Sequence, residues 1–460
     1  LISKTILQQV KTNITYVTAI GFHIAIGLLI YLNESLAKIY FAVALVYFLY
    51  RILLVNDTQK TFEVLKACAY FVGAEVFFRT TRGAVSYEAG KYLVILFILI
   101  GMFYKGISGK GYPYFIYLML LIPSIFVAST TLSFDANFRT NIAFVLSGPL
   151  CLGLAALFCY DKKVTFKQMS QILMFMLLPI LSHTAYVYFY APDLRDILTS
   201  TASNREAAGG FGSNQVATVL GLGMFLLGIR LFLNSKTIGI RFLNTALLIF
   251  VSYRAVVTLS RGGVIAGILC ILIFLLFYYI QAKSKIKNQV IGVFVLFVAA
   301  LALAWFVSSS QSSGLTDKRY ANQNARGVEK GNVTTGRADL FLEEIDGFLT
   351  NPFLGIGSSR AKDRRIEEEG QGVTSHNEIS RTLAEHGVFG VIILIILLFK
   401  PLDLRSKNIK NYYFFAFLAF WFATINHSSM RIAAPAFIYA LALLNVVNEK
   451  NPVHRKQLKK

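Results

Sequence analysis

The sequence predicts an all-α, polytopic integral membrane protein of about 12 to 14 transmembrane helices with one large external helical loop. Two observations on composition support this fold class: 55% of the 460 residues are hydrophobic and only 15% are charged, and the mean hydropathy is +0.58. In addition, apolar runs of about 20 residues, the length that crosses a bilayer as a helix, recur between charged or turn-rich breaks. This composition excludes an ordinary soluble domain.

The apolar runs, about fourteen by the length criterion, follow one another along the whole chain. Several of these runs are short or contain Gly and Pro, so the lower end of the predicted range is about 12 spans. The first run lacks the cleavage pattern of a signal peptide, so we expect it to be a retained helix. The runs fall near residues 14 to 32, 36 to 55, 62 to 78, 90 to 104, 113 to 130, 141 to 160, 166 to 190, 214 to 230, 240 to 258, 262 to 281, 289 to 309, 378 to 399, 411 to 426 and 431 to 448.

The distribution of Lys and Arg predicts the orientation. These residues gather in alternate breaks, such as Lys162 to Lys167 and Lys400 to Lys410, and at both ends of the chain. Because basic residues are retained on the cytoplasmic side, this bias predicts cytoplasmic amino and carboxy termini. It also explains the net charge of +21 without a nucleic-acid partner, since the basic residues form no single stripe.

One break differs from the others and sets the predicted domain boundaries. Residues 310 to 377 form a polar stretch with 10 of the chain's 24 acidic residues. We expect a small external subdomain at 310–377, between transmembrane parts at 1–309 and 378–448, and a basic cytoplasmic tail at 449–460.

A helix is predicted inside this external subdomain. Thr334 or Thr335 can cap it, and Phe341, Ile345 and Phe348 recur at helical spacing before Asn351-Pro352 ends it. We expect this apolar stripe to face the membrane domain.

The sequence lacks the motifs of several classes of enzyme and metal site. The four cysteines lie inside apolar runs without CxxC spacing, so neither a disulfide framework nor a zinc site is indicated. GxSxG, HExxH, GxxxxGK[ST] and the metal-binding DxD do not occur, which disfavours a hydrolase triad, a zincin and a nucleotide-driven pump. The sequence therefore predicts no cofactor and no metal. The cysteines are Cys68, Cys151, Cys159 and Cys270.

Two arginines are candidate anion-binding residues on the external side. Arg261 lies in a tight break, where Gly262 and Gly263 allow a partner to approach the backbone closely. Arg337 falls in the first turn of the predicted external helix, where it can hold an anion together with the backbone amides. Each arginine has a structural alternative. Arg261 could simply extend from a helix end to the membrane interface, and Arg337 could form a surface salt bridge to Asp339 or Glu343.

His376 is the candidate base. It precedes a predicted helix from about 376 to 400, about 36 Å long, which would hold the imidazole at or above the outer interface. A histidine titrates near neutral pH and can accept a proton from a sugar or side-chain hydroxyl. A purely structural role for this loop histidine is the alternative.

Five short motifs follow one another on the predicted external side: SRGG at 260–263, TGR at 335–337, NPFLGIG at 351–357, SHNE at 375–378 and AEHGVFG at 384–390. In this order and on one side of the membrane, they resemble the O-antigen ligase and O-antigen polymerase superfamily of bacterial envelope glycosyltransferases. The likeness covers roughly residues 200 to 400, including an element from Arg205 to Gln215.

The resemblance implies a glycosyltransferase with a saccharide donor linked to a lipid diphosphate. It would move a glycan from undecaprenyl diphosphate to an acceptor hydroxyl at the periplasmic face of the bacterial inner membrane, with inversion and without a metal. It assigns His376 as general base and Arg261 and Arg337 to the donor diphosphate. Further candidates for substrate contact are Arg205, Gln215, Arg254 and Asn377.

The acceptor distinguishes the alternatives within this superfamily. A ligase uses a lipid A core sugar, a polymerase another lipid-linked glycan, and a protein O-oligosaccharyltransferase a Ser or Thr. The acidic residue after His376-Asn377 favours the ligase. A lipid-linked glycan flippase or transporter is the rival from another class; it would require charges near the middle of the bilayer and halves related by symmetry. Only Lys66 and Arg254 are basic residues well within predicted spans.

Overall fold

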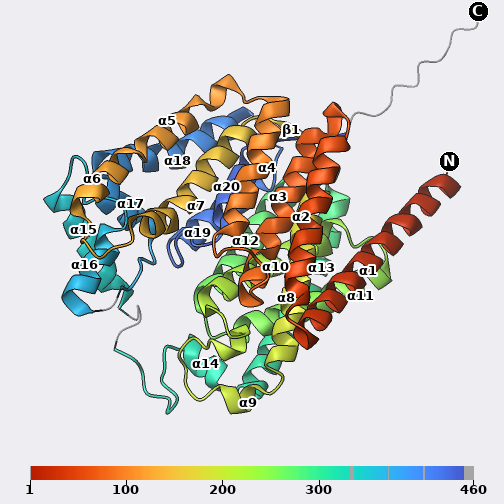
Figure 1. Ribbon diagram of the computed structural model, residues 1–460. Helices are drawn as coiled ribbons and strands as arrows, with labels where there is room; N and C mark the ends of the chain where they lie inside the picture. Colours follow the sequence, from red (N-terminus) through yellow and green to blue (C-terminus); the bar gives the residue numbers. More distant parts are fainter. Residues whose placement is uncertain (1, 332–335, 371, 408–409, 450–460) are drawn as a thin grey trace, which may run out of the picture.

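The computed structural model describes residues 2–331, 336–370, 372–407 and 410–449. It is a bundle of long helices with a smaller group of short helices beside it (Figure 1). The predicted all-α fold class is confirmed, since the only paired strands in the described residues are two of three residues each.

The helices follow the predicted apolar runs closely. In the first part of the chain they are α1 (Ile2–Leu32), α2 (Leu36–Leu54), α3 (Asp57–Thr80), α4 (Ala89–Lys105), η1 (Gly109–Gly111), α5 (Tyr112–Leu120), α6 (Pro123–Thr131), α7 (Phe138–Cys159), α8 (Phe166–Tyr190), α9 (Leu194–Ile197), η2 (Glu206–Ala208), α10 (Ser213–Leu233), α11 (Ile238–Val257), α12 (Arg261–Gln281) and α13 (Ser284–Gln311). The later helices are α14 (Leu315–Tyr320), α15 (Arg337–Thr350), α16 (Arg360–Glu369), α17 (Glu378–His386), α18 (Val388–Lys407), α19 (Phe414–Ile425) and α20 (Ala433–Ala442).

Nine stretches of the described residues are long and apolar enough to cross a membrane. The other predicted spans are also helical, but α4, α19 and α20 are shorter, and α3 and α18 carry more charged residues. These differences account for the lower number of helices that meet the length and hydropathy criteria.

The connections between helices separate into two ends of the bundle. At one end, β1 (Lys163–Thr165) pairs in parallel with β2 (Asn445–Val447), which joins the α7–α8 and post-α20 connections. At the other end, Asn204 donates its backbone N–H to Thr258 O at 3.0 Å, and Lys330 Nζ donates to Thr201 Oγ1 at 2.8 Å. The second group of loops surrounds the candidate site.

Close packing of α10 against α12 positions the start of α12. A Cβ at Gly221 would lie 2.0 Å from Gly263 O, and one at Gly263 would lie 2.2 Å from the backbone of Ala217. Only glycine permits this approach. It brings Arg261, the first residue of α12, beside the amino-terminal half of α10.

The predicted continuous helix from 376 to 400 is wrong. The chain forms two helices, α17 and α18, with Gly387 between them at φ +58° and ψ −134°. The loop of the NPFLGIG motif packs into this break: Val388 N donates to Pro352 O at 2.7 Å, and Ile356 N donates to Ala384 O at 2.8 Å. A Cβ on Gly387 would lie 2.6 Å from Gly355 N. Gly355 and Gly387, from the NPFLGIG and AEHGVFG motifs, therefore allow this loop to pack closely against the break between α17 and α18.

The helix predicted in the external subdomain exists as α15. Its candidate caps Thr334 and Thr335 lie outside the described residues, and Asn351 follows its last residue as expected. The expected orientation of its apolar stripe is only partly correct. The fully buried positions are Glu344 and Gly347, which face α17, whereas Phe341 is 38% exposed.

Candidate functional site

Arg261 begins α12 at the end of the bundle that carries the external loops. Its side chain is partly buried, and Nη1 donates to Arg319 O at 3.4 Å. The glycine that follows it is closely packed: a Cβ at Gly262 would lie 2.3 Å from the imidazole of His427. The SRGG motif thus places Gly262 directly against the imidazole of His427.

Three guanidinium groups gather around this helix start. Arg319, on α14, donates from Nε to Leu259 O at 2.9 Å. Burial lowers the pKa of Arg319, and the positive charges of Arg261 and Arg337 lower it further. The pKa of Arg337 is lowered by burial and then by Arg261. Among the described residues, no carboxylate forms an ion pair with Arg319 or Arg337. The cluster therefore carries excess positive charge, which suits an anionic ligand.

His376 lies next to this cluster. Arg337 and His376 line one cavity of about 290 Å³, together with Phe341, Asn377 and Asn426. Burial lowers the pKa of His376 to about 4, and the positive charges of Arg431 and Arg337 act in the same direction. The imidazole is consequently neutral near pH 7 and has a lone pair available.

The hydrogen bonds of His376 identify which nitrogen carries that lone pair. Nδ1 lies 3.0 Å from Thr374 O. A carbonyl oxygen only accepts hydrogen bonds, so Nδ1 carries the proton and donates it to Thr374. Nε2 is then the unprotonated nitrogen of the neutral ring.

The loop before His376 is held from two sides. On one side, Arg431 Nη2 donates to Thr374 O at 3.0 Å and to Ser375 O at 2.7 Å. On the other, the buried carboxylate of Glu344 accepts hydrogen bonds from Ser375 Oγ at 3.1 Å and from Ser380 Oγ at 2.6 Å. These contacts fix the backbone that presents the imidazole.

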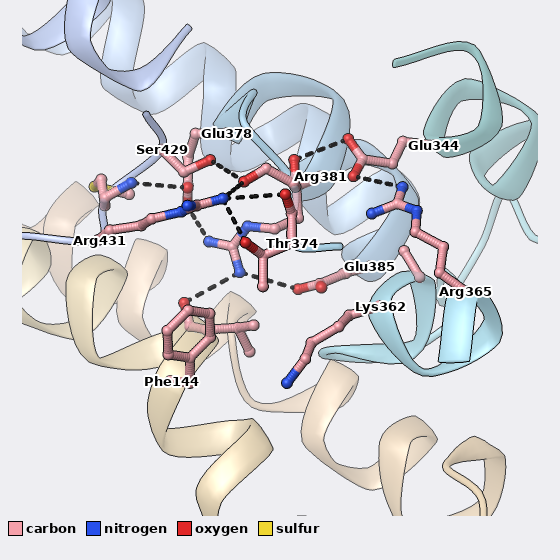
Figure 2. Close-up of a pocket in the computed structure, with 14 residues that line it drawn as sticks. Phe144, Glu344, Lys362, Arg365, Thr374, Glu378, Arg381, Glu385, Ser429 and Arg431 are labelled. Carbon is pink, nitrogen blue, oxygen red and sulfur yellow. Dashed lines mark hydrogen bonds and ion pairs between the residues drawn. The ribbon is translucent and has the colours of Figure 1, made fainter. Parts of the chain in front are cut away.

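A second cavity, of about 440 Å³, lies behind this loop and shares Glu344 and Ser375 with the first (Figure 2). Arg381 is the centre of its ion pairs: the guanidinium contacts the carboxylate of Glu378 and, at 3.4 Å, that of Glu385. Arg365 pairs with Glu344 at 3.2 Å. Both Arg365 and Arg381 thus pair with carboxylates, whereas Arg319 and Arg337 form no such pair within the part of the chain that the structure describes.

The structure brings four of the predicted site residues together: Arg261, Arg337, His376 and Asn377. Asn377 lies beside His376 but caps α17, where its Oδ1 accepts from the backbone of Ile379 and Ser380, and its Nδ2 donates to Asn426 at 3.1 Å.

The other three predicted residues lie apart from this cavity. Arg205 is exposed, and its Nε donates to Gly210 O at 2.7 Å. Gln215 is buried and bonds Arg79 at 2.7 Å and Tyr87 at 2.8 Å. Arg254 is fully buried, and its Nη atoms donate to the backbone carbonyls of Ala191, Val187 and Ala207. The position of Arg254 favours a structural role in the loop after α8.

Sequence reasoning missed Arg319, Arg431 and Glu344. Arg431 carries a detectable signal, since it is the first residue of a predicted span, directly after a short break on the predicted external side. Arg319 and Glu344 lie in a polar stretch with many other charged residues, so nothing in their spacing separates them. Among the residues that the structure describes, His, Cys, Asp and Glu form no group of three that could hold a metal ion.

Comparison with known proteins bears on the same part of the chain. Residues 246–395 match the family model described as O-antigen ligase. This segment, about a third of the chain, is similar to the O-antigen ligase family. This ligase-family segment contains Arg261, Arg319, Arg337 and His376 but not Arg431. No curated protein matches the chain.

The family match and the helices agree on the general class of protein. They support a membrane-embedded enzyme of the O-antigen ligase or polymerase type, with glycosyltransferase-like activity. The motifs that carry the predicted resemblance from 260–263 to 384–390 all fall within the matched segment.

Proposed function

We propose that this protein is an O-antigen ligase-like glycosyltransferase that moves a glycan from undecaprenyl diphosphate to an acceptor hydroxyl, a lipid A core sugar, at the periplasmic face of the inner membrane. The observation that carries the proposal is one neutral imidazole beside Arg337, whose guanidinium, like that of nearby Arg319, forms no ion pair with a carboxylate of the described residues. A diphosphate and an attacking hydroxyl require these two kinds of group at adjacent positions.

The proposed reaction is a single displacement. His376 Nε2 accepts the proton of the acceptor hydroxyl while its oxygen forms a bond to the anomeric carbon of the donor. The bond from that carbon to the diphosphate oxygen breaks, and the electron pair leaves with the diphosphate. Attack opposite to the leaving group inverts the anomeric configuration. Each step uses side chains of this protein, so the proposed reaction is metal-independent.

The arginines have their largest proposed effect on the leaving group. Negative charge increases on the diphosphate as the anomeric bond breaks, so Arg261, Arg319 and Arg337 would stabilise the transition state more than the bound donor. A hydrogen bond to a charged group contributes about 1.5 to 3 kcal/mol, which corresponds to about 10- to 100-fold in rate for each arginine.

The cavity wall also suits a saccharide. Phe341 provides an apolar surface, and Asn377 and Asn426 provide amide groups beside His376. These neutral polar groups can hydrogen-bond sugar hydroxyls without competing for the diphosphate.

A transfer assay with purified protein tests the proposal. The donor is an undecaprenyl-diphosphate-linked glycan, and the acceptors, supplied separately, are lipid A core, a second lipid-linked glycan and a Ser/Thr-containing protein. We expect glycan on the lipid A core with inverted anomeric configuration and undiminished activity in a metal chelator. Transfer only to the second glycan or to the protein would instead make the enzyme a polymerase or a protein O-oligosaccharyltransferase. Donor translocation without transfer would make it a flippase.

A further inference from the structure

We propose that Arg431 is a positioning residue that holds the Thr374–Ser375 backbone and so fixes the orientation of the His376 imidazole, whose Nε2 acts as the base. This inference rests on the proposed function, in which His376 acts as general base. Arg431 lies outside the ligase-family segment, in the connection between α19 and α20.

The geometry of the guanidinium supports this role. Arg431 Nη2 contacts Thr374 O, Thr374 Oγ1 and Ser375 O, and it lies 3.5 Å from His376 Nδ1. Arg431 and His376 Nδ1 thus donate to the same carbonyl, Thr374 O. Arg431 therefore holds in place the carbonyl that accepts the Nδ1 proton of His376. It fixes the orientation of the ring through the backbone of Thr374 and Ser375.

Arg431 is itself held from the membrane domain. Its backbone carbonyl accepts from Arg79 Nη1 at 3.0 Å, and the neighbouring Ala433 N donates to Glu75 at 2.6 Å. Arg79 and Glu75, both on α3, form a buried ion pair at 2.6 Å. The first part of the chain thus fixes the segment that orients His376.

The segment also contacts the His376 loop directly. Met430 N donates to Glu378 at 3.2 Å, and Ser429 Oγ donates to Ser375 O at 3.3 Å. Arg431 is therefore part of a network of hydrogen bonds between two loops. This degree of restraint is characteristic of a residue that orients another side chain.

The charges that face His376 come from several elements. α15 contributes Arg337 and, through Ser375, the paired carboxylate of Glu344. The α19–α20 connection contributes Arg431 and His427. Burial is the main cause of the lowered pKa of His376, and among the charged groups Arg431 lowers it most. Removal of its charge should raise that pKa.

Chemical labelling tests the inference without requiring turnover. Diethyl pyrocarbonate acylates unprotonated imidazole, so the labelling rate of the His376 peptide against pH, followed by mass spectrometry, reports the pKa. In the wild-type protein we expect half-maximal labelling near pH 4, and in R431Q an upward shift towards the ordinary value of 6.5. The control R360Q removes a cation from the same external subdomain, where Arg360 pairs with Asp363 and Glu367, and should leave the profile unchanged. An unchanged profile in folded R431Q would overturn the inference.

Kinetics of R431K separate positioning from charge, and this variant also serves if R431Q does not fold. An ammonium preserves the charge but not the planar group that contacts two carbonyls. We expect the labelling profile of wild type, a kcat lowered by about 10- to 100-fold as for loss of an orienting partner, and an unchanged KM for the donor. A raised KM with unchanged kcat would show that Arg431 contacts the donor and would overturn the positioning role. Transfer retained in H376A would contradict the proposed base, whereas the labelling experiment would still test the influence of Arg431.

Discussion

The two cavities on either side of the His376 loop differ in how their charges are balanced. Behind the loop, Arg365 and Arg381 each contact carboxylates. In front of it, Arg337 lines the cavity of His376 and lies within electrostatic reach of Arg319, and neither arginine forms an ion pair with a carboxylate of the described residues. Both cavities are lined by Glu344 and Ser375. On one side of these residues lies the ion-pair network that supports the loop, and on the other lie the cations proposed to bind the donor. Charge pairing thus distinguishes the scaffold from the candidate site.

The largest expected effect concerns the base in the unbalanced cavity. H376A removes the proton acceptor, so transfer should fall by about 10²- to 10⁴-fold. Donor binding and the thermal unfolding temperature should remain close to wild type, because the imidazole makes only loop contacts. Turnover, donor titration and thermal unfolding of the same preparation measure all three quantities. Full turnover in H376A would reject the base assignment.

A substitution in the cavity behind the loop should lower stability, whereas H376A should lower only transfer. R381Q leaves two buried carboxylates, Glu378 and Glu385, without their cation, which should cost about 3 to 5 kcal/mol in the free energy of unfolding. The matched control is R360Q, whose more exposed ion pairs should cost at most about 1 kcal/mol. Denaturation in detergent compares the two variants. Equal stability of R381Q and R360Q would mean that this cavity does not support the fold.

A smaller effect is expected for the unpaired cations. R337Q should lower transfer by about 10- to 100-fold, because one charge-assisted hydrogen bond to the diphosphate is lost. Its unfolding temperature should not decrease, since a repelled charge is removed. R337K should also transfer slowly, because an ammonium lacks the planar pair of donors. If R337Q unfolds more easily than wild type and transfers normally, Arg337 belongs to the scaffold.

The smallest expected effect is the pH dependence. The pKa of His376 is lowered to about 4, so the unprotonated base persists well below the ordinary value of 6.5. Between pH 7.5 and 5.5, kcat/KM should therefore change by less than about twofold, and it should fall only as pH approaches 4. A steep loss near pH 6.5 in a pH–rate profile would show that the burial and cations around His376 do not act in the working enzyme.

The sequence predicts the bundle well and the site only in part, for a physical reason. A bilayer span is a local property, so apolar runs such as 166 to 190 predict α8 at the same residues. The break at Gly387 is invisible locally, because it depends on the loop around Gly355 packing against it. Arg319 and Arg431 acquire their positions only through contacts with distant segments, at Leu259 and Thr374. Motif likeness identified His376 and Arg337, whereas their supporting residues required the fold.

The most direct test of the central claim, that the unbalanced cations hold the donor beside His376, is a titration of undecaprenyl diphosphate against purified variants. We predict that H376A and R360Q bind with wild-type Kd, whereas R319Q and R337Q bind at least about tenfold more weakly. Wild-type affinity in both R319Q and R337Q would contradict the account.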